Sequence, residues 1–265
     1  MPFDISLLCI AGLLVGSFLN VIISRFGTDE SFVRGRSRCN ACRSTIAWYD
    51  NVPVLSFILL RGKCRACGEP ISWQYPGVEL STAILFAVAG VVFPPSGTAE
   101  SAFGLVFALG LIGTLSVVFV YDLIHMEIPV SALAFGIIWT VLYLSLSFFF
   151  DEPGLPLSVS RLADGIIGGA IAFSLFYGLV FFSKETWMGM GDAWLALILG
   201  LVSGWELLLP ALTIAFGSGA LVGIFLMITG KKGLQSRIPF GPFLAASVIF
   251  ILFLGTMVGE AFGFG

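Results

Sequence analysis

Residues 102–122 read AFGLVFALGLIGTLSVVFVYD, and this stretch decides the class of fold. Its first 20 residues carry no charge, and Asp122 follows them directly. A helix needs about 20 mostly apolar residues to cross the hydrocarbon core of a bilayer. Lipid offers no partners to backbone N–H and C=O groups, so a run this apolar must satisfy its own backbone as a helix. The stretch therefore predicts a membrane-spanning helix that ends at a carboxylate.

Seven other apolar runs accompany this one. The eight runs predict spans at residues 5–24, 77–93, 102–121, 129–150, 163–183, 192–205, 207–229 and 241–262. Only 11% of the residues are charged, whereas a soluble domain carries about 25%. This composition excludes an ordinary soluble protein and predicts an all-α, polytopic membrane helix bundle of about eight transmembrane helices. The sixth span is the shortest, and Trp205 and Glu206 separate it poorly from the seventh.

The basic residues indicate the orientation. Eight of the 13 Lys and Arg lie within residues 25–75. Four more fall in loops on the same side of an eight-span scheme: Lys184, Lys231, Lys232 and Arg237. Only Arg161 lies on the other side. Lys and Arg favour cytoplasmic loops, so we expect residues 25–75 in the cytosol and both termini outside.

Four of the five cysteines lie in this cytosolic loop, as two CxxC pairs: Cys39, Cys42, Cys64 and Cys67. Two such pairs about 20 residues apart are typical of a structural zinc site with four thiolate ligands. Two disulfides are the alternative, but a reducing cytosol disfavours them. The basic residues are explained by topology and anionic lipid, so no nucleic-acid partner is expected. The sequence thus predicts a small cytosolic zinc-binding loop domain at residues 25–75.

Three carboxylates lie at the cytosolic ends of predicted spans, where an ionisable group is costly and is a candidate functional residue. Asp122 ends the third span, Asp192 opens the sixth, and Glu79 lies just inside the second. Two carboxylates that share one proton can hydrolyse a peptide bond without a metal. The alternative is that Asp122 and Asp192 only cap helix ends, which would suit Asp192 well. Gly189 and Gly191 would let the backbone approach an extended substrate closely.

Glycines spaced four residues apart occur in three predicted spans, where they indicate close helix packing rather than catalysis. The pairs are Gly12 and Gly16, Gly165 and Gly169, and Gly219 and Gly223.

An ordered set of motifs resembles the bacterial type IV prepilin peptidases, whose Gly-x-Gly-Asp signature is shared with presenilin-like intramembrane proteases. The motifs run nearly from end to end: Gly16-Ser-Phe-Leu-Asn20, the two CxxC pairs, Tyr75-Pro-x-Val-Glu79-Leu, Asp122 ahead of Ile128-Pro129, Gly189-Met-Gly-Asp192, and Ile238-Pro-Phe-Gly-Pro-Phe243. The chain departs from the family pattern at Val130, where Asp is frequent, and at Trp194, where Lys is common.

The resemblance implies a membrane aspartyl endopeptidase of the bacterial inner membrane with Asp122 and Asp192 as catalytic residues. It implies type IV prepilin or pseudopilin substrates, cleaved at the cytosolic face, and N-methylation of the new N-terminus with S-adenosylmethionine. Glu79 is then a candidate for substrate or methyl-donor binding. The expected organisation is a first transmembrane helix at residues 1–24, the zinc domain at 25–75 and a catalytic bundle at 76–265.

Two other classes of function remain open from the residues alone. A polytopic transporter could use the buried carboxylates as a proton relay, although no inverted repeat is evident. A structural subunit of a pilus or secretion assembly is the third possibility.

Overall fold

The computed structural model describes residues 5–28, 31–32, 34–147, 160–230 and 238–262. Lys231, Lys232 and Arg237, which entered the orientation argument, lie outside the described residues, as does the side chain of Arg161. The chain divides into two compact units, Met1–Leu105 and Val106–Gly265. The expected three-part organisation along the chain remains a prediction.

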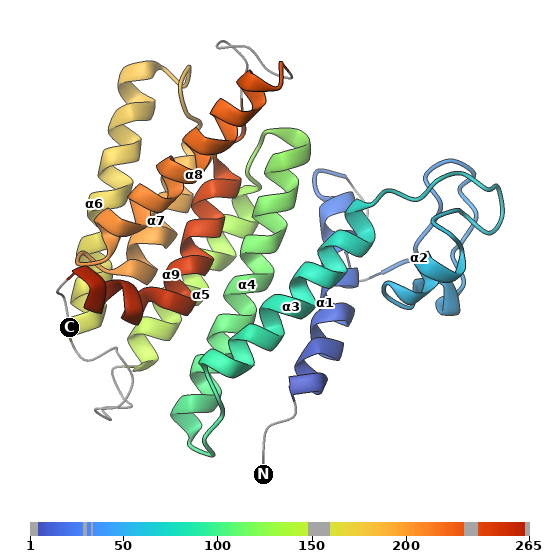
Figure 1. Ribbon diagram of the computed structural model, residues 1–265, viewed down its shortest axis with the longest axis horizontal. Coiled ribbons are helices and arrows are strands. Elements are labelled where there is room, and N and C mark those ends of the chain that lie inside the picture. Colours follow the sequence, from blue (N-terminus) through green and yellow to red (C-terminus); the bar gives the residue numbers. More distant parts are fainter. Residues whose placement is uncertain (1–4, 29–30, 33, 148–159, 231–237, 263–265) are drawn as a thin grey trace. The chain divides into compact units, whose positions relative to one another are not determined.

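In the first unit, helices α1 (Ile5–Arg25) and α3 (Gln74–Val92) pack side by side (Figure 1). The glycine pair of α1 makes this possible, because a Cβ atom added at Gly12 would lie 2.6 Å from the Cα of Ala83. One added at Gly16 would lie 2.7 Å from the Cα of Glu79. The expectation that this pair marks close helix packing is confirmed.

The segment between α1 and α3 carries little regular structure. It contains a short 3-10 helix, η1 (Trp48–Asn51), and the five-residue helix α2 (Leu55–Leu59). No strand longer than an isolated bridge occurs in the described part of this segment. Neither η1 nor α2 contains a buried residue.

The described residues of the second unit form a bundle of six helices. They are α4 (Ala99–His125), which begins just before the unit boundary, α5 (Val130–Ser147), α6 (Ser160–Ser183), α7 (Met190–Ser203), α8 (Leu208–Ile228) and α9 (Gly241–Phe262). With α1 and α3, these helices match the eight predicted spans. Seven of the eight are long and apolar enough to cross a membrane, and α7 is the short one. The all-α, polytopic fold is confirmed.

Helix α7 is short because it lies at the centre of its unit, in contact with α5, α6, α8 and α9. Its 14 residues span about 21 Å at 1.5 Å per residue, less than the roughly 30 Å of a bilayer core. Leu195, Ile198 and Leu199 are fully buried. Because its neighbours cover it, α7 has no need of the length that a lipid-facing helix requires.

The contact between α6 and α7 depends on glycine. A Cβ atom at Gly165 would lie 2.8 Å from the carbonyl oxygen of Leu201, and one at Gly200 would overlap the backbone of Gly168. The second predicted glycine pair therefore lies in a close helix contact. The third does not, because an added Cβ at Gly219 would meet the rings of Phe243 and Phe240, at ordinary distances of 3.4 and 3.6 Å. That prediction is wrong: aromatic side chains fill the space there.

Helix α4 is held against α5 by a buried contact. The Trp139 indole Nε1 donates a hydrogen bond of 3.1 Å to the Phe107 carbonyl oxygen, and the rings of Phe107 and Tyr143 stack with centroids 3.9 Å apart. The contact joins the first half of α4 to the second half of α5 within the second unit.

Candidate active site

Both predicted catalytic aspartates belong to the second unit, on helices that are not neighbours in sequence. Asp122 lies in the last turn of α4, and Asp192 is the third residue of α7. The two carboxylates are close enough to interact electrostatically. The structure thus brings together the two acidic side chains that the sequence singled out.

The Asp192 side chain is oriented by its own helix. Its Oδ2 accepts a hydrogen bond of 3.1 Å from the Gly189 N–H, and its N–H donates to the Gly189 carbonyl at 3.1 Å. A carboxylate in the first turn of a helix also interacts favourably with the helix dipole. The expected capping role of Asp192 is therefore real, and it holds the carboxylate in place without occupying its second oxygen.

Capping does not explain Asp122. This residue lies near the C-terminus of α4, where the helix dipole disfavours negative charge. The side chain is 4% exposed, and its Oδ2 is buried without a hydrogen-bond partner among the described residues. Buried polar atoms are nearly always paired, so an unpaired carboxylate oxygen beside a second carboxylate is a feature that structural stability does not require.

Gly241, the first residue of α9, shapes the space around Asp122. Its backbone amide faces the Asp122 carboxylate. A Cβ atom at this position would lie 2.5 Å from Asp122 Oδ2 and 3.0 Å from Ile128 Cδ1. Any side chain here would displace the carboxylate. The sequence analysis quoted the motif that contains Gly241 without giving this glycine a role, because its importance depends on a residue 119 positions earlier in the chain.

The two glycines before Asp192 differ in their surroundings. A Cβ atom at Gly191 would lie 2.9 Å from Ile128 Cβ, so this glycine permits close packing between α7 and the turn after α4. A Cβ atom at Gly189 would have no protein atom closer than 3.9 Å, and Gly189 is exposed. Open space beside the Asp192 carboxylate is where a substrate backbone could approach, so Gly189 is the better candidate for substrate access.

Glu79, the third carboxylate, belongs to the first unit. It lies in α3, is 7% exposed, and its Oε2 accepts a hydrogen bond of 2.7 Å from the Val54 N–H. Val54 has a φ of 58°, a conformation that is strained for a β-branched residue. Glu79 therefore holds the loop domain in a specific conformation at the start of α3.

The four cysteines form one cluster, with their sulfur atoms all within 4.8 Å of one another. They are free thiols, and the Sγ atoms of Cys39 and Cys67 lie 3.9 Å apart, far beyond the roughly 2.05 Å of a disulfide. Four thiolates bound to zinc at about 2.3 Å would place their sulfurs about 3.8 Å apart in a tetrahedron. The cluster therefore has the size of a metal site, and the disulfide alternative has no support.

The two CxxC pairs have the same backbone conformation, offset by 25 residues. In the first, the Cys39 N–H donates to Ser44 and the Ser37 carbonyl accepts from Ile46; in the second, the Cys64 N–H donates to Glu69 and the Gly62 carbonyl accepts from Ile71. Each turn also requires a positive φ one residue after its second cysteine, 59° at Arg43 and 76° at Gly68. Two matching turns, each presenting two sulfurs, form a four-cysteine cluster that could hold a metal ion.

Backbone groups also favour the thiolate form that binds metal. The pKa of the Cys64 thiol is lowered because its sulfur accepts the backbone N–H groups of Cys67 and Ala66. Hydrogen bonds from the side chain and backbone of Ser44 lower the pKa of Cys42 to about 6. These donors stabilise negative charge on Cys42 and Cys64. At Cys67 the Glu69 N–H has the same effect, but burial and the three neighbouring cysteines outweigh it and raise the pKa to about 12.

Comparison with known proteins identifies the family. Residues 10–93 match the bacterial peptidase A24 N-terminal domain, and residues 109–224 match the type IV leader peptidase family. The chain is 34% identical over 254 residues to the prepilin leader peptidase/N-methyltransferase of Bacillus subtilis (strain 168), and the match covers 96% of each chain. It is 32% identical to the type 4 prepilin-like proteins leader peptide-processing enzyme of Escherichia coli O78:H11, over 92% of each chain.

A relative from Myxococcus xanthus (strain DK1622), also a prepilin leader peptidase/N-methyltransferase, is 38% identical over 238 residues, which are 88% of this chain and 66% of the relative. No solved structure matches the chain. The matched regions together contain Glu79, the four clustered cysteines and both aspartates. The chain therefore belongs to the type IV leader peptidase family.

Proposed function

We propose that this protein is an aspartyl endopeptidase of the bacterial inner membrane that removes the leader peptide from type IV prepilins or pseudopilins at the cytosolic face. The observation that carries the proposal is the pairing of Asp122 with Asp192, together with the buried, unpaired Oδ2 of Asp122. Family membership and the names of the relatives support the same substrate class.

The dyad can act as acid and base together. Two adjacent carboxylates do not both ionise readily, so one retains a proton. The ionised carboxylate accepts a proton from the attacking water, while the protonated one donates a hydrogen bond to the scissile carbonyl. When the tetrahedral intermediate collapses, a carboxylic acid returns a proton to the leaving amine. The Gly189 amide holds Asp192 in place during this exchange.

The geometry favours a protease over the alternatives. A proton relay requires carboxylates at successive depths through the membrane, whereas Asp122 and Asp192 form one pair at helix ends. The matched families and the named relatives are peptidases, and none of them is described as a transporter. A purely structural subunit would have no use for an unpaired buried carboxylate oxygen.

The cysteine cluster would hold zinc in a structural role. Its four ligands leave no open position for water, so the metal would replace the apolar core that the loop domain lacks. By the distribution of basic residues, this domain is cytosolic and both termini are periplasmic. The names of the relatives also indicate a second activity, N-methylation, for which S-adenosylmethionine would supply the methyl group.

Replacing each aspartate by asparagine tests the dyad. Asp122→Asn and Asp192→Asn should each abolish leader cleavage by the purified protein in detergent, because one carboxylate cannot act as both acid and base. Asp164→Asn is the matched control. Asp164 Oδ1 accepts a hydrogen bond of 2.9 Å from the Trp205 N–H, and an amide oxygen keeps that bond. Near-normal cleavage by either dyad variant, with the control also active, would disprove the aspartyl mechanism.

A further inference from the structure

The segment between α1 and α3 carries an exposed apolar surface that the aspartate pair does not use. We name it the apolar patch, and its side chains come from η1, from α2 and from the residue before α3: Trp48, Leu55, Ile58, Leu59 and Trp73. Leu59, Trp73 and Trp48 are 71%, 77% and 78% exposed. Single exposed apolar residues are ordinary, but several on adjoining elements indicate a surface that contacts a partner.

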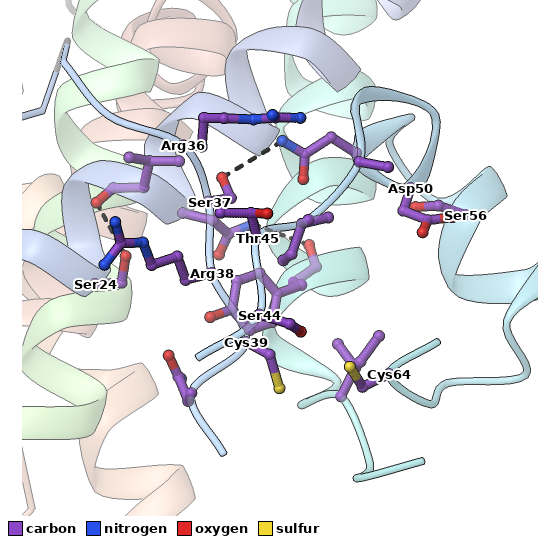
Figure 2. A pocket seen from close by; sticks show the side chains of 18 of the residues that line it. Ser24, Arg36, Ser37, Arg38, Cys39, Ser44, Thr45, Asp50, Ser56 and Cys64 are labelled. Carbon is purple, nitrogen blue, oxygen red and sulfur yellow. Dashed lines mark hydrogen bonds between the residues drawn. The ribbon is translucent and has the colours of Figure 1, made fainter. Parts of the chain in front are cut away.

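Helix α2 has two distinct faces. Ser56 is on the inner face, where it lines a polar cavity together with Ser24 of α1 (Figure 2). Leu55, Ile58 and Leu59 are all exposed. Residues three and four positions apart lie on the same side of a helix, so these three side chains share the other face. The apolar face of α2 is therefore not the face that packs on the rest of its unit.

Contacts with α3 place α2 beside the end of a candidate span. The Val54 N–H, directly before α2, donates a hydrogen bond of 2.7 Å to Glu79 Oε2. Glu79 lies five residues beyond Gln74, the first residue of α3, which is about 7.5 Å along the helix axis. The Phe57 ring lies against the Trp73 ring, with centroids 4.9 Å apart. In Figure 1, α2 is level with the body of α1 and not beyond its end. The apolar patch thus lies where the surface of a bilayer begins.

The residues beside the patch match the chemistry of a lipid surface. Arg61 and Lys63 are exposed and closely follow α2. Basic residues beside a span attract anionic headgroups, and Trp is enriched where a membrane meets water. An apolar helix face next to basic residues and Trp is typical of a helix that lies in the membrane surface.

We propose that α2 is an interfacial membrane anchor, which inserts its apolar face between the headgroups and acyl chains of the lipid beside α1 and α3. Both ends of the segment continue into candidate spans. The patch is therefore already held at the membrane, and a weak local affinity is sufficient for docking. The docked helix holds the cysteine-containing segment at a fixed depth relative to these spans. The inference depends on the spans and not on the proposed peptidase activity.

Photolabelling from lipid tests the anchor on the unaltered full chain. The purified protein is reconstituted into vesicles of phosphatidylethanolamine and phosphatidylglycerol that contain a phospholipid with a diazirine near its acyl carbonyl. Mass spectrometry should find lipid on residues 55–59 as well as on the spans, and none on the first cysteine turn, residues 39–45. Label on the spans but none on residues 48–59, whether a second copy covers the patch or the patch stays in water, would overturn the proposal.

Two double variants separate the apolar contribution from the electrostatic one. Ile58→Gln with Leu59→Gln should lower the label on α2 at least about tenfold, because two apolar side chains no longer enter the lipid. Arg61→Gln with Lys63→Gln should remove the gain in label that added phosphatidylglycerol gives over phosphatidylcholine alone. Ala41→Gln, an exposed change in the first cysteine turn, is the matched control and should keep full label. Full label on α2 in the folded Ile58→Gln, Leu59→Gln variant would also overturn the proposal.

Discussion

A single methyl group added at Gly241 should inactivate the peptidase without unfolding it. The new Cβ atom would lie 2.5 Å from Asp122 Oδ2, whereas close carbon–oxygen contacts in proteins lie at about 3.3 Å or more. The carboxylate must therefore move by roughly 0.8 Å. Whether Asp122 rotates or the start of α9 shifts, the two carboxylates lose their mutual geometry.

The magnitudes separate the effect on catalysis from the effect on folding. A misplacement of about 1 Å can reduce a rate by about 100-fold. Overpacking a buried site costs about 1–3 kcal/mol, and replacing glycine by alanine in a helix recovers up to about 1 kcal/mol. Gly241→Ala should thus lower kcat for leader cleavage by about 100-fold and lower the unfolding free energy by at most about 3 kcal/mol.

The assay is the rate of leader removal by purified protein in detergent, with thermal unfolding measured on the same samples. Gly113→Ala is the matched control, because it lies in the same helix as Asp122 and an added Cβ there meets no atom within 4 Å. It should cleave at the normal rate. If Gly241→Ala is folded and also cleaves normally, the placement of Asp122 in the reaction is refuted.

Four other changes have distinct expected outcomes. Gly189→Ala adds a methyl group in open space, so it should preserve the melting temperature and raise KM about tenfold or more by obstructing the substrate backbone. Gly191→Ala should instead lower the unfolding free energy by about 1–3 kcal/mol, because its Cβ would lie 2.9 Å from Ile128 Cβ. A loss of stability in Gly189→Ala together with a raised KM and full stability in Gly191→Ala would contradict the assigned roles. Gly200→Ala should disrupt the contact with Gly168 and cost about 3 kcal/mol or more in unfolding free energy, and a neutral effect would show that α6 and α7 are not in close contact. Elemental analysis should find one zinc per chain, lost when the second CxxC pair is changed to serine; metal retained in that variant would disprove the four-thiolate site.

Sequence predicted the fold class well because a bilayer constrains composition so strongly. Eight apolar runs became eight helices, and even the short sixth span was evident from its length. The glycine pairs were a weaker signal. Two mark close backbone contacts, but at Gly219 the neighbouring Phe243 ring fills the space. The spacing of glycines within a helix shows which face of the helix lacks side chains. The partner helix then determines whether backbone or side chains pack against that face.

The aspartates and cysteines were also evident from sequence. Carboxylates are rare in apolar spans, and paired cysteines are unusual in a loop with so few apolar residues. Two features were not. The matching cysteine turns are formed by backbone N–H and C=O groups, so Arg43 and Gly68 occupy equivalent positions without side-chain similarity. Gly241 matters only because folding places it against Asp122. No local pattern records a contact between residues so distant in sequence.

The most direct test of the central claim is mass spectrometry of the product that the purified protein makes from a full-length prepilin in detergent. The dyad lies at helix ends that the basic residues assign to the cytosolic side, where a leader in the cytosol meets the apolar helix of the substrate. The expected result is one new N-terminus immediately after the glycine that precedes the apolar stretch, and no product from Asp122→Asn or Asp192→Asn. A cut within the apolar helix, or the normal product from either variant, would contradict the account.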